Sequence, residues 1–272
     1  MPTKKQLRSE KKLKNQTKQK KKYPLLLKKI VSISDIILEV LDARFIKETR
    51  NKSIEKEAKK QDKKIIYVLN KSDLIKYKKI PKNLIPHIFV SCKSRTGIKE
   101  LRDKIKLISK KIENPVSEKI NVGVIGYPNT GKSSLINTLV GKSSAGTGAD
   151  AGFTKGIQKL KLTPEIMLID TPGVIPEEDY SGTEKNALAK HAEVSGRSYS
   201  QVKEPEIIIS KLMEKYGNLL DKHYKINSEG DSEILIEKLG RKKGFLKKGG
   251  DVNEDKTSRF ILKEWQKGII KV

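Results

Sequence analysis

The sequence predicts an α/β fold, with a mostly parallel sheet that carries helices on both faces, followed by a small all-helical C-terminal domain. Two observations lead to this fold class. Apolar runs typical of strands alternate with helical segments as far as about residue 170, a pattern that favours a parallel sheet covered on both faces. Farther along, the segments are helical and have little strand character. We expect three parts: a basic flexible arm (1–30), an α/β domain (31–178) and a helical domain (179–272).

The predicted elements follow in order along the chain. Strands are expected where apolar residues cluster, over residues 35–41, 64–69, 87–90, 120–125, 158–162 and 166–169. Helices are expected over 51–60, from Gly97 to about Ile112, from about Gly131 onward, and over 184–194, 204–216, 231–239 and 253–267. Because a parallel sheet presents its functional groups at the carboxyl ends of its strands, we expect the chemistry there.

Positive charge dominates this chain of 272 residues. It has 59 Lys and Arg against 33 Asp and Glu, a net charge of +26, and residues 1–30 hold 12 basic residues and 1 acidic one. A flexible basic arm neutralises phosphates without reading a base sequence, and this arm has few apolar residues to insert into lipid. We therefore expect RNA rather than a membrane as the partner. A lysine-rich surface that is merely solvated is the alternative.

Several classes of protein are excluded by composition. No apolar run approaches the roughly 18 residues of a membrane span. Cys92 is the single cysteine, so an internal disulfide is impossible and a cysteine-based zinc cluster is not expected. The basic start of the chain has no apolar segment of the kind that a secretory signal needs. We expect a monomeric, cytoplasmic protein.

A phosphate-binding loop is the strongest motif. The run Gly126-Tyr127-Pro128-Asn129-Thr130-Gly131-Lys132-Ser133 matches G-x-x-x-x-G-K-[ST] and lies between a predicted strand and a predicted helix. Backbone N–H groups of such a loop approach phosphate oxygens closely, Lys132 reaches the terminal phosphates, and the Ser133 hydroxyl ligates Mg²⁺. The nucleotide-binding residues expected here are Asn129, Thr130, Gly131, Lys132, Ser133 and Ser134.

A second motif completes the phosphate and magnesium site. Asp170-Thr171-Pro172-Gly173 follows the strand predicted over 166–169, where a carboxylate can hold the metal and Gly173 can bring its N–H to a γ-phosphate. An ordinary turn is the alternative for this tetrapeptide alone. Thr154 lies on the glycine-rich stretch before it and could close on Mg²⁺, with Thr147 as a competitor. Lys132, Thr154 and Gly173 are therefore the candidate catalytic residues, and Ser133, Thr154 and Asp170 the candidate magnesium ligands.

Two short segments are expected to select the base. Asn70-Lys71-Ser72-Asp73 follows the strand predicted over 64–69, and Ser91-Cys92-Lys93 follows the next strand. A carboxylate at Asp73 can accept from two guanine N–H groups, whereas adenine would leave it unpaired in a buried site. The stem of Lys71 can cover the ring, Asn70 can brace the loop, and the Cys92 N–H can meet the guanine O6. A chance match to N-K-x-D in so lysine-rich a chain is the alternative.

Together these motifs resemble those of a P-loop GTPase, in a shuffled order: the base-reading motifs precede the phosphate-reading ones. A parallel sheet tolerates such an order if the ordinary ends are joined, here by residues 113–118. The arrangement is similar to the circularly permuted GTPases of the YlqF/YawG type, which act in ribosome assembly. Asp42-Ala43-Arg44 also resembles that family, and residues 244–251 with 265–268 look like its C-terminal helical domain.

The resemblance implies a GTP-hydrolysing switch that uses GTP, GDP and Mg²⁺ in late assembly of the large ribosomal subunit. Its implied partners are rRNA and the large-subunit precursor, contacted by the basic arm and by the cluster Arg241-Lys242-Lys243 with Lys247-Lys248. A solvated helix end is the alternative for that cluster. Trp265 is expected to anchor the helical core.

Two positions bear on the rate of hydrolysis. Where many GTPases have a glutamine that orients water, this chain has Val174, so slow intrinsic turnover is expected. Asn129 matches the residue that ligates K⁺ in similar potassium-activated GTPases, and a loop residue that merely stabilises a turn is the alternative. We expect K⁺ and the ribosomal partner to accelerate hydrolysis. Relatives near YlqF carry a histidine in an N-terminal segment, but residues 1–30 hold none. His87, His191 and His223 are interpreted as packing residues.

Three other functions remain open at this point. One is an RNA-binding module that uses nucleotide without significant hydrolysis. Another is an ATP-dependent phosphotransferase built on the same loop. The third keeps the GTPase activity but moves the client to another RNA, such as tRNA, or to a membrane surface.

Overall fold

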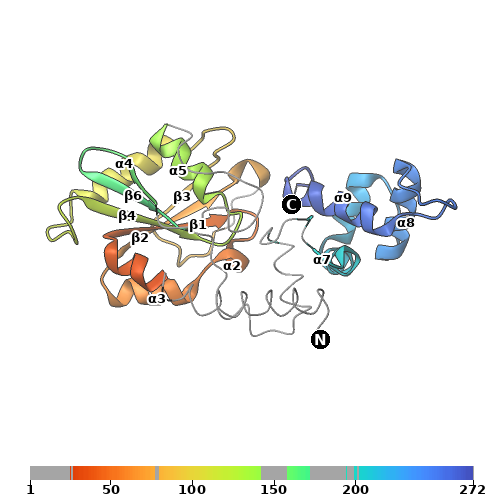
Figure 1. Cartoon of the computed structure of the whole chain (residues 1–272), viewed down its shortest axis with the longest axis horizontal. Coiled ribbons are helices and arrows are strands. Elements are labelled where there is room, and N and C mark those ends of the chain that lie inside the picture. Colours follow the sequence, from red (N-terminus) through yellow and green to blue (C-terminus); the bar gives the residue numbers. More distant parts are fainter. Residues whose placement is uncertain are drawn as a thin grey trace, which may run out of the picture.

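An α/β part and a helical part lie next to each other in the computed structural model (Figure 1). The structure describes residues 25, 27–76, 80–141, 158–171, 194, 199–200 and 202–271. Residues 1–24, the predicted boundary at residue 178 and all of the helix predicted over 184–194 except Val194 lie outside these ranges. Among the described residues, no helix is both long and apolar enough to span a bilayer.

The predicted, mostly parallel sheet is confirmed. Its strands are β1 (Ile36–Asp42), β2 (Lys64–Asn70), β3 (His87–Phe89), β4 (Ile120–Gly126), β5 (Gln158–Lys161) and β6 (Ile166–Asp170). Their order across the sheet is β3-β2-β1-β4-β6-β5, and every pairing is parallel except that of β5 with β6. The register sets Asp42 beside Asn70 and Val124 beside Asp170, so the segments that follow β1, β2, β4 and β6 leave the same edge.

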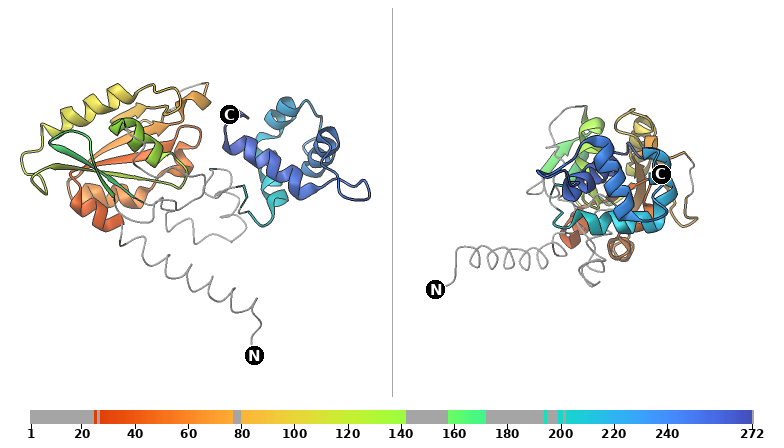
Figure 2. Two further views of the ribbon diagram at one scale, coloured as in Figure 1. Left: turned by 45° about the horizontal axis from the view of Figure 1, so that its top comes forward. Right: turned by 90° about the vertical axis from the view of Figure 1, so that its right-hand side faces the viewer.

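Helices cover both faces of this sheet, as predicted (Figures 1 and 2). On one face, α4 (Ile98–Ser109) and α5 (Lys132–Val140) pack their apolar sides on side chains of β1, β2, β4 and β6. On the other face lie α3 (Lys52–Lys60) and a helical segment over residues 27–33. Two short elements were not predicted: α2 (Ile46–Thr49) and the 3-10 turn η1 (Ser72–Leu74).

The helical segment over 27–33 packs on the α/β part. Leu27, Ile30 and Val31 are buried against Ile37 of β1 and Ile54 of α3. Burial of such side chains out of water is favourable, so this short basic stretch folds onto the sheet. The predicted division of the chain at residue 31 stays a prediction, and the buried side chains next to it include Leu27 and Ile30.

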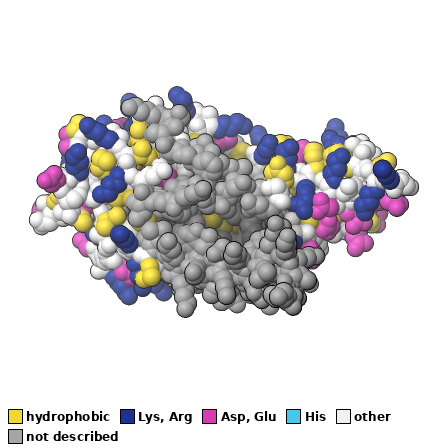
Figure 3. All heavy atoms as spheres, viewed as in Figure 1, with side chains coloured by type: hydrophobic (Ala, Val, Ile, Leu, Met, Phe, Trp, Pro, Cys, Tyr) yellow, Lys and Arg dark blue, Asp and Glu magenta, His cyan; other side chains and the backbone are white. Residues whose placement is uncertain are grey.

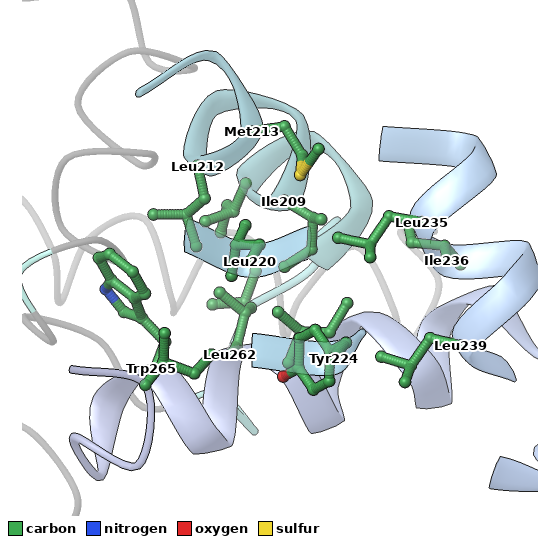
Figure 4. Close-up of a cluster of buried hydrophobic side chains, with 14 of the residues drawn as sticks. Ile209, Leu212, Met213, Leu220, Tyr224, Leu235, Ile236, Leu239, Leu262 and Trp265 are labelled. Carbon is green, nitrogen blue, oxygen red and sulfur yellow. The ribbon is translucent and has the colours of Figure 1, made fainter. Parts of the chain in front are cut away.

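The helical part consists of α7 (Pro205–Tyr224), α8 (Ser232–Lys243) and α9 (Glu254–Gln266). Their side chains meet in one core, drawn in Figure 4, in which Trp265 is fully buried as expected. Helix α7 runs past the predicted end at residue 216, because a kink at Tyr216 (φ −132°) joins two helical stretches. Helix α8 runs to Lys243, where Gly244 ends it in a left-handed conformation (φ 66°). Phe45 and Tyr127 of the α/β part belong to the same core.

Candidate nucleotide-binding site

The loop between β4 and α5 has a shape that two glycines make possible. A Cβ at Gly126 would lie 2.4 Å from the Val40 carbonyl oxygen. A Cβ at Gly131, which has φ +94°, would lie 2.3 Å from the side-chain nitrogen of Asn70. Only glycine fits both positions, and the loop then enters a helix N-terminus, where backbone N–H groups and the helix dipole favour phosphate.

Lys132 lies inside this loop. Its ammonium is buried and donates to the carbonyl oxygens of Gly126 (3.1 Å) and Tyr127 (2.9 Å). Burial lowers the pKa of Lys132 to about 8, an effect that nearby Asp170 opposes and Lys71 reinforces. Phosphate oxygens would supply the negative charge that two neutral carbonyls lack.

Ser133 and Asp170 lie side by side at the carboxyl ends of neighbouring strands. The Ser133 Oγ is 3.4 Å from Asp170 Oδ2, and the other carboxylate oxygen accepts from the Thr171 N–H at 2.8 Å. A hydroxyl and a carboxylate are the hard oxygen ligands that Mg²⁺ prefers, so these residues fit that ion. Within the described ranges, no group of three or more His, Cys, Asp or Glu could hold a metal. Mg²⁺ at this place would therefore need nucleotide phosphates and water as further ligands.

The two expected base-reading segments contact each other. The Ser91 hydroxyl donates to Asp73 Oδ1 at 2.6 Å, and the Ser72 N–H donates to the Val90 carbonyl at 3.1 Å. The Asp73 side chain is exposed at the sheet edge, with Ser91 buried beneath it. A buried hydroxyl that orients an exposed carboxylate is suited to hold that carboxylate toward a ligand.

Cys92 and Lys93 differ in their surroundings. Lys93 is exposed, whereas Cys92 is half-buried with its Sγ 3.5 Å from Asn70 Oδ1. Burial raises the pKa of the Cys92 thiol, so the side chain stays neutral. Cys92 therefore behaves as a small loop residue. Its backbone N–H, and not its thiol, is the group expected to contact the guanine O6.

A hydrogen bond joins the two halves of the site. Asn70 donates from its side-chain amide to the Thr130 carbonyl oxygen at 2.8 Å, and both residues are buried. The segment after β2 thus faces the phosphate loop across the end of β1. This contact joins the base-reading motif to the phosphate loop, two segments that we expected to lie close together.

A buried ion cluster lies beside Lys71. Its residues Asp42 and Arg44 were expected only through the family resemblance, which gave them no role. The Lys71 ammonium donates to Asp42 Oδ2 at 2.8 Å, and Arg44 forks onto both oxygens of the same carboxylate at 3.0 and 2.7 Å. Burial would raise the pKa of Asp42, but Lys71 and Arg44 outweigh it and hold that pKa well below its usual range. The available signal was a carboxylate at the end of a buried strand beside the strand that carries Asn70.

The remaining expected residues fall into two groups. Thr147, Thr154, Gly173, Val174 and His191 lie outside the described residues, so the roles given to Thr154 and Gly173 stay predictions. His87 and His223 have local contacts. The His87 Nδ1 is 2.6 Å from the Leu84 carbonyl oxygen, and the His223 Nε2 is 3.5 Å from Glu264.

Comparisons with known proteins find a GTPase family model and several GTP-binding proteins. Residues 121–235 match the family model described as 50S ribosome-binding GTPase. The GTP-binding protein MJ1464 of Methanocaldococcus jannaschii is 38% identical over 259 residues, covering 91% of this chain and 66% of that protein. Nucleolar GTP-binding protein 2 of Saccharomyces cerevisiae is 35% identical, covering 90% of this chain and 51% of that protein. The chain thus spans between about half and two thirds of these relatives' length.

Solved structures show the same fold. YlqF from T. maritima in its GNP-bound form is 23% identical, with a TM-score of 0.64 over 90% of this chain and 93% of that one. Its GDP-bound form is 24% identical, with the same TM-score over 89% and 94%. The likeness covers both the sheet and the helical part, since it extends over nearly the whole of each chain.

Proposed function

The chain belongs to the circularly permuted P-loop GTPases of the YlqF/YawG type, and we propose on this premise that it binds GTP and GDP and hydrolyses GTP. The observation that carries the proposal is the hydrogen bond from Asn70 to the Thr130 carbonyl. It brings a guanine-type motif and a phosphate loop into one site. Two unrelated short motifs have no reason to converge in this way, whereas one nucleotide needs both at once.

The residues of this site have distinct roles in the proposal. Asp73, oriented by Ser91, accepts the guanine N–H groups, while Lys132 and the loop N–H groups hold the phosphates. Ser133 and Asp170, with Thr154 assigned from the sequence, would hold Mg²⁺, and that ion would offset negative charge on the phosphates. Gly173, assigned from the sequence alone, would supply its N–H to the γ-phosphate.

Turnover is slow in this proposal because valine at position 174 cannot orient water. The proposal also includes stimulation of hydrolysis by K⁺, with Asn129 as the residue that would bind the ion. Asn129 has φ 59°, a left-handed conformation that costs little for asparagine. Potassium beside the phosphates would add positive charge where an arginine finger is otherwise needed.

The proposed client is a precursor of the large ribosomal subunit. The matching family is described as ribosome-binding, and the chain carries a net charge of +26. On the face shown in Figure 3, Lys and Arg side chains lie over both the sheet and the helical part. In the basic cluster, Arg241 pairs with Glu237 and Lys242 donates to the Tyr224 carbonyl, so exposed Lys247 and Lys248 are the better candidates for rRNA phosphates.

Sedimentation of cell extract tests this client. We expect the full chain to co-sediment with a large-subunit fraction in a non-hydrolysable GTP analogue and to leave it in GDP. Lys247→Gln combined with Lys248→Gln should weaken that association without changing nucleotide affinity. RNA crosslinking to tRNA, or flotation of the chain with membranes, would show that the client is not the large-subunit precursor.

Single-turnover hydrolysis tests the enzyme class. With GTP in the presence of Mg²⁺, we expect slow release of phosphate that K⁺ and large-subunit precursors accelerate, and loss of it in Lys132→Ala. Nucleotide binding without hydrolysis under all of these conditions would favour an RNA-binding module. Preference for ATP over GTP would favour a phosphotransferase. We further propose that the chain acts as a monomer in the cytoplasm, which fractionation and light scattering would test.

A further inference from the structure

The buried carboxylate of Asp42 forms ion pairs with two side chains, that of Lys71 in the base-reading motif and that of Arg44 in the segment after β1. It accepts from Lys71 of the base-reading motif at 2.8 Å, and from Arg44 through the side chain (3.0 and 2.7 Å) and the backbone N–H (3.1 Å). The side chains of Asp42 and Arg44 are both 0% exposed. A buried carboxylate with this many donors is held in one orientation, so the ammonium that it anchors is held as well.

Arg44 also contacts the helical part. Its third donor group, Nη1, donates to the carbonyl oxygen of Trp265 at 3.1 Å, in the last turn of α9. The neighbouring Phe45 ring lies 6.0 Å from the Trp265 ring, centroid to centroid. The guanidinium therefore links a buried carboxylate of the α/β part to the end of a helix that lies 221 residues farther along the chain.

A second contact joins the same helix end to the base-reading motif. A Cβ placed on Gly268 would lie 2.4 to 3.0 Å from the side chain of Leu74, the last residue of the short turn that contains Asp73. Gly268 directly follows the residue that ends α9. The end of α9 thus approaches the base-reading motif both through Arg44 and Asp42 and through Leu74.

We propose that Asp42 and Arg44 are positioning residues of the guanine site, through which the docking of α9 sets the affinity for guanine nucleotides. Asp42 fixes the Lys71 side chain over the place of the base. Arg44 fixes Asp42 and is itself fixed by the end of α9. The inference rests on the proposed function, because it concerns the same nucleotide site.

The chemistry of the cluster requires an arginine. A planar guanidinium forks onto both carboxylate oxygens and still has a donor left for a carbonyl, whereas a lysine ammonium acts as a single point charge. Loss of the fork leaves Asp42 free to turn with Lys71. Coupling of this kind is reciprocal, so guanine nucleotide should in turn strengthen the docking of α9.

Arg44→Lys tests the proposal, with Arg259→Lys as a matched control. Arg259 also forks onto a carboxylate, that of Asp255, and donates to a backbone carbonyl, that of Tyr199, but it does not contact the cluster. We expect Arg44→Lys to weaken GDP binding by about tenfold, as for loss of a hydrogen bond to a charged group. Arg259→Lys should leave GDP affinity unchanged. Equal affinities in all three proteins would overturn the proposal.

A double variant separates positioning from general loosening of the fold. If Arg44 acts through Lys71, then adding Arg44→Lys to Lys71→Met should weaken GDP binding little further. Full additivity of the two effects would show that Arg44 acts by another route and would refute the inference.

Hydrogen exchange tests the proposal on the wild-type chain, so its result does not depend on whether a variant folds. GDP should slow exchange in the backbone of residues 262–270, at the end of α9, and unchanged exchange there would count against the proposal. Absence of guanine-nucleotide binding in the wild type would overturn the proposed function together with this inference. Wild-type binding with an unaffected Arg44→Lys variant would overturn this inference alone.

Discussion

Asn70 donates from its side-chain amide to the carbonyl oxygen of Thr130 at 2.8 Å, across a separation of 60 residues. Strand β1 lies between the strands that carry the two motifs, so the contact spans the carboxyl end of that strand. Both residues are buried, and a buried carbonyl without a donor is costly. The base-reading segment therefore braces the phosphate loop directly.

This contact predicts the effect of Gly131→Ala. The new Cβ would lie 2.3 Å from the Asn70 amide nitrogen, on a backbone with φ +94°. We expect GDP affinity to fall at least about tenfold, because the Asn70 amide must move away from Thr130. Calorimetric titration with GDP measures it.

Gly141→Ala is the control for this change. Gly141 also has a positive φ, +77°, but a Cβ there meets nothing within 4 Å. We expect a loss of about 1–2 kcal/mol in the free energy of unfolding from backbone strain, with GDP affinity unchanged. Equal losses of GDP affinity in the two variants would show that the Asn70 contact plays no part.

Asp73→Asn should change the preferred base. An amide can donate to the 2-carbonyl of xanthine but cannot accept from both guanine N–H groups, so GDP affinity should fall by about a hundredfold and XDP affinity should rise. Competition binding with GDP, XDP and ADP measures it. Unchanged base preference would remove Asp73 from the guanine site.

Ser91→Ala should weaken guanine binding more mildly. The Ser91 hydroxyl donates to the Asp73 carboxylate at 2.6 Å, so its loss leaves that carboxylate less well oriented. We expect about fivefold weaker GDP binding with the preference for guanine retained. A switch of base preference in this variant would contradict an orienting role.

The pKa of Lys132 predicts a pH dependence of nucleotide affinity. Burial lowers it to about 8, and bound phosphates would raise it again, so binding takes up a proton near and above that pH. GDP affinity should therefore fall as pH rises, by about fourfold between about pH 7 and about pH 8.5. Fluorescence titration across this range measures it.

Lys132→Arg separates this proton from those of the nucleotide itself. A guanidinium stays charged over the whole range, so the fall in affinity attributed to Lys132 should vanish in the variant even though its binding is weaker. The same slope in both proteins would place the titrating group elsewhere.

Two glycines of the helical part should respond oppositely to alanine. In α8, a Cβ on Gly240 would lie 2.3 Å from Val252 Cγ1 and 2.9 Å from Thr257 Oγ1, so overpacking should cost about 1–3 kcal/mol. In α7, Gly217→Ala meets only Met213 Cε at 3.5 Å and should gain about 0.5–1 kcal/mol. Urea unfolding followed by circular dichroism measures both. Destabilisation by Gly217→Ala would contradict the packing described for α7.

Local patterns predicted most of the α/β part. Six strands, α3, α4 and α5 lie close to their predicted positions, because each has its own apolar periodicity and its own end signal. The 27–33 helix was missed, since its few apolar residues gain stability only against Ile37 and Ile54. The extension of α7 to Tyr224 was missed. The helix is kinked at Tyr216, and the residues after the kink are helical again because they pack in the helical core.

By itself, the sequence determined the order of the strands along the chain, the phosphate loop and the base-reading motif, all of which depend on residues that are adjacent in the chain. Only the tertiary structure decided what Lys71 contacts. Lys71 and Asp42 are 29 residues apart, Arg44 and Trp265 are 221 residues apart, and no local periodicity connects either pair. Lys71 meets Asp42 because β1 pairs with β2, and Arg44 meets the Trp265 carbonyl because the end of α9 packs beside the segment after β1. Both depend on packing between side chains distant in sequence.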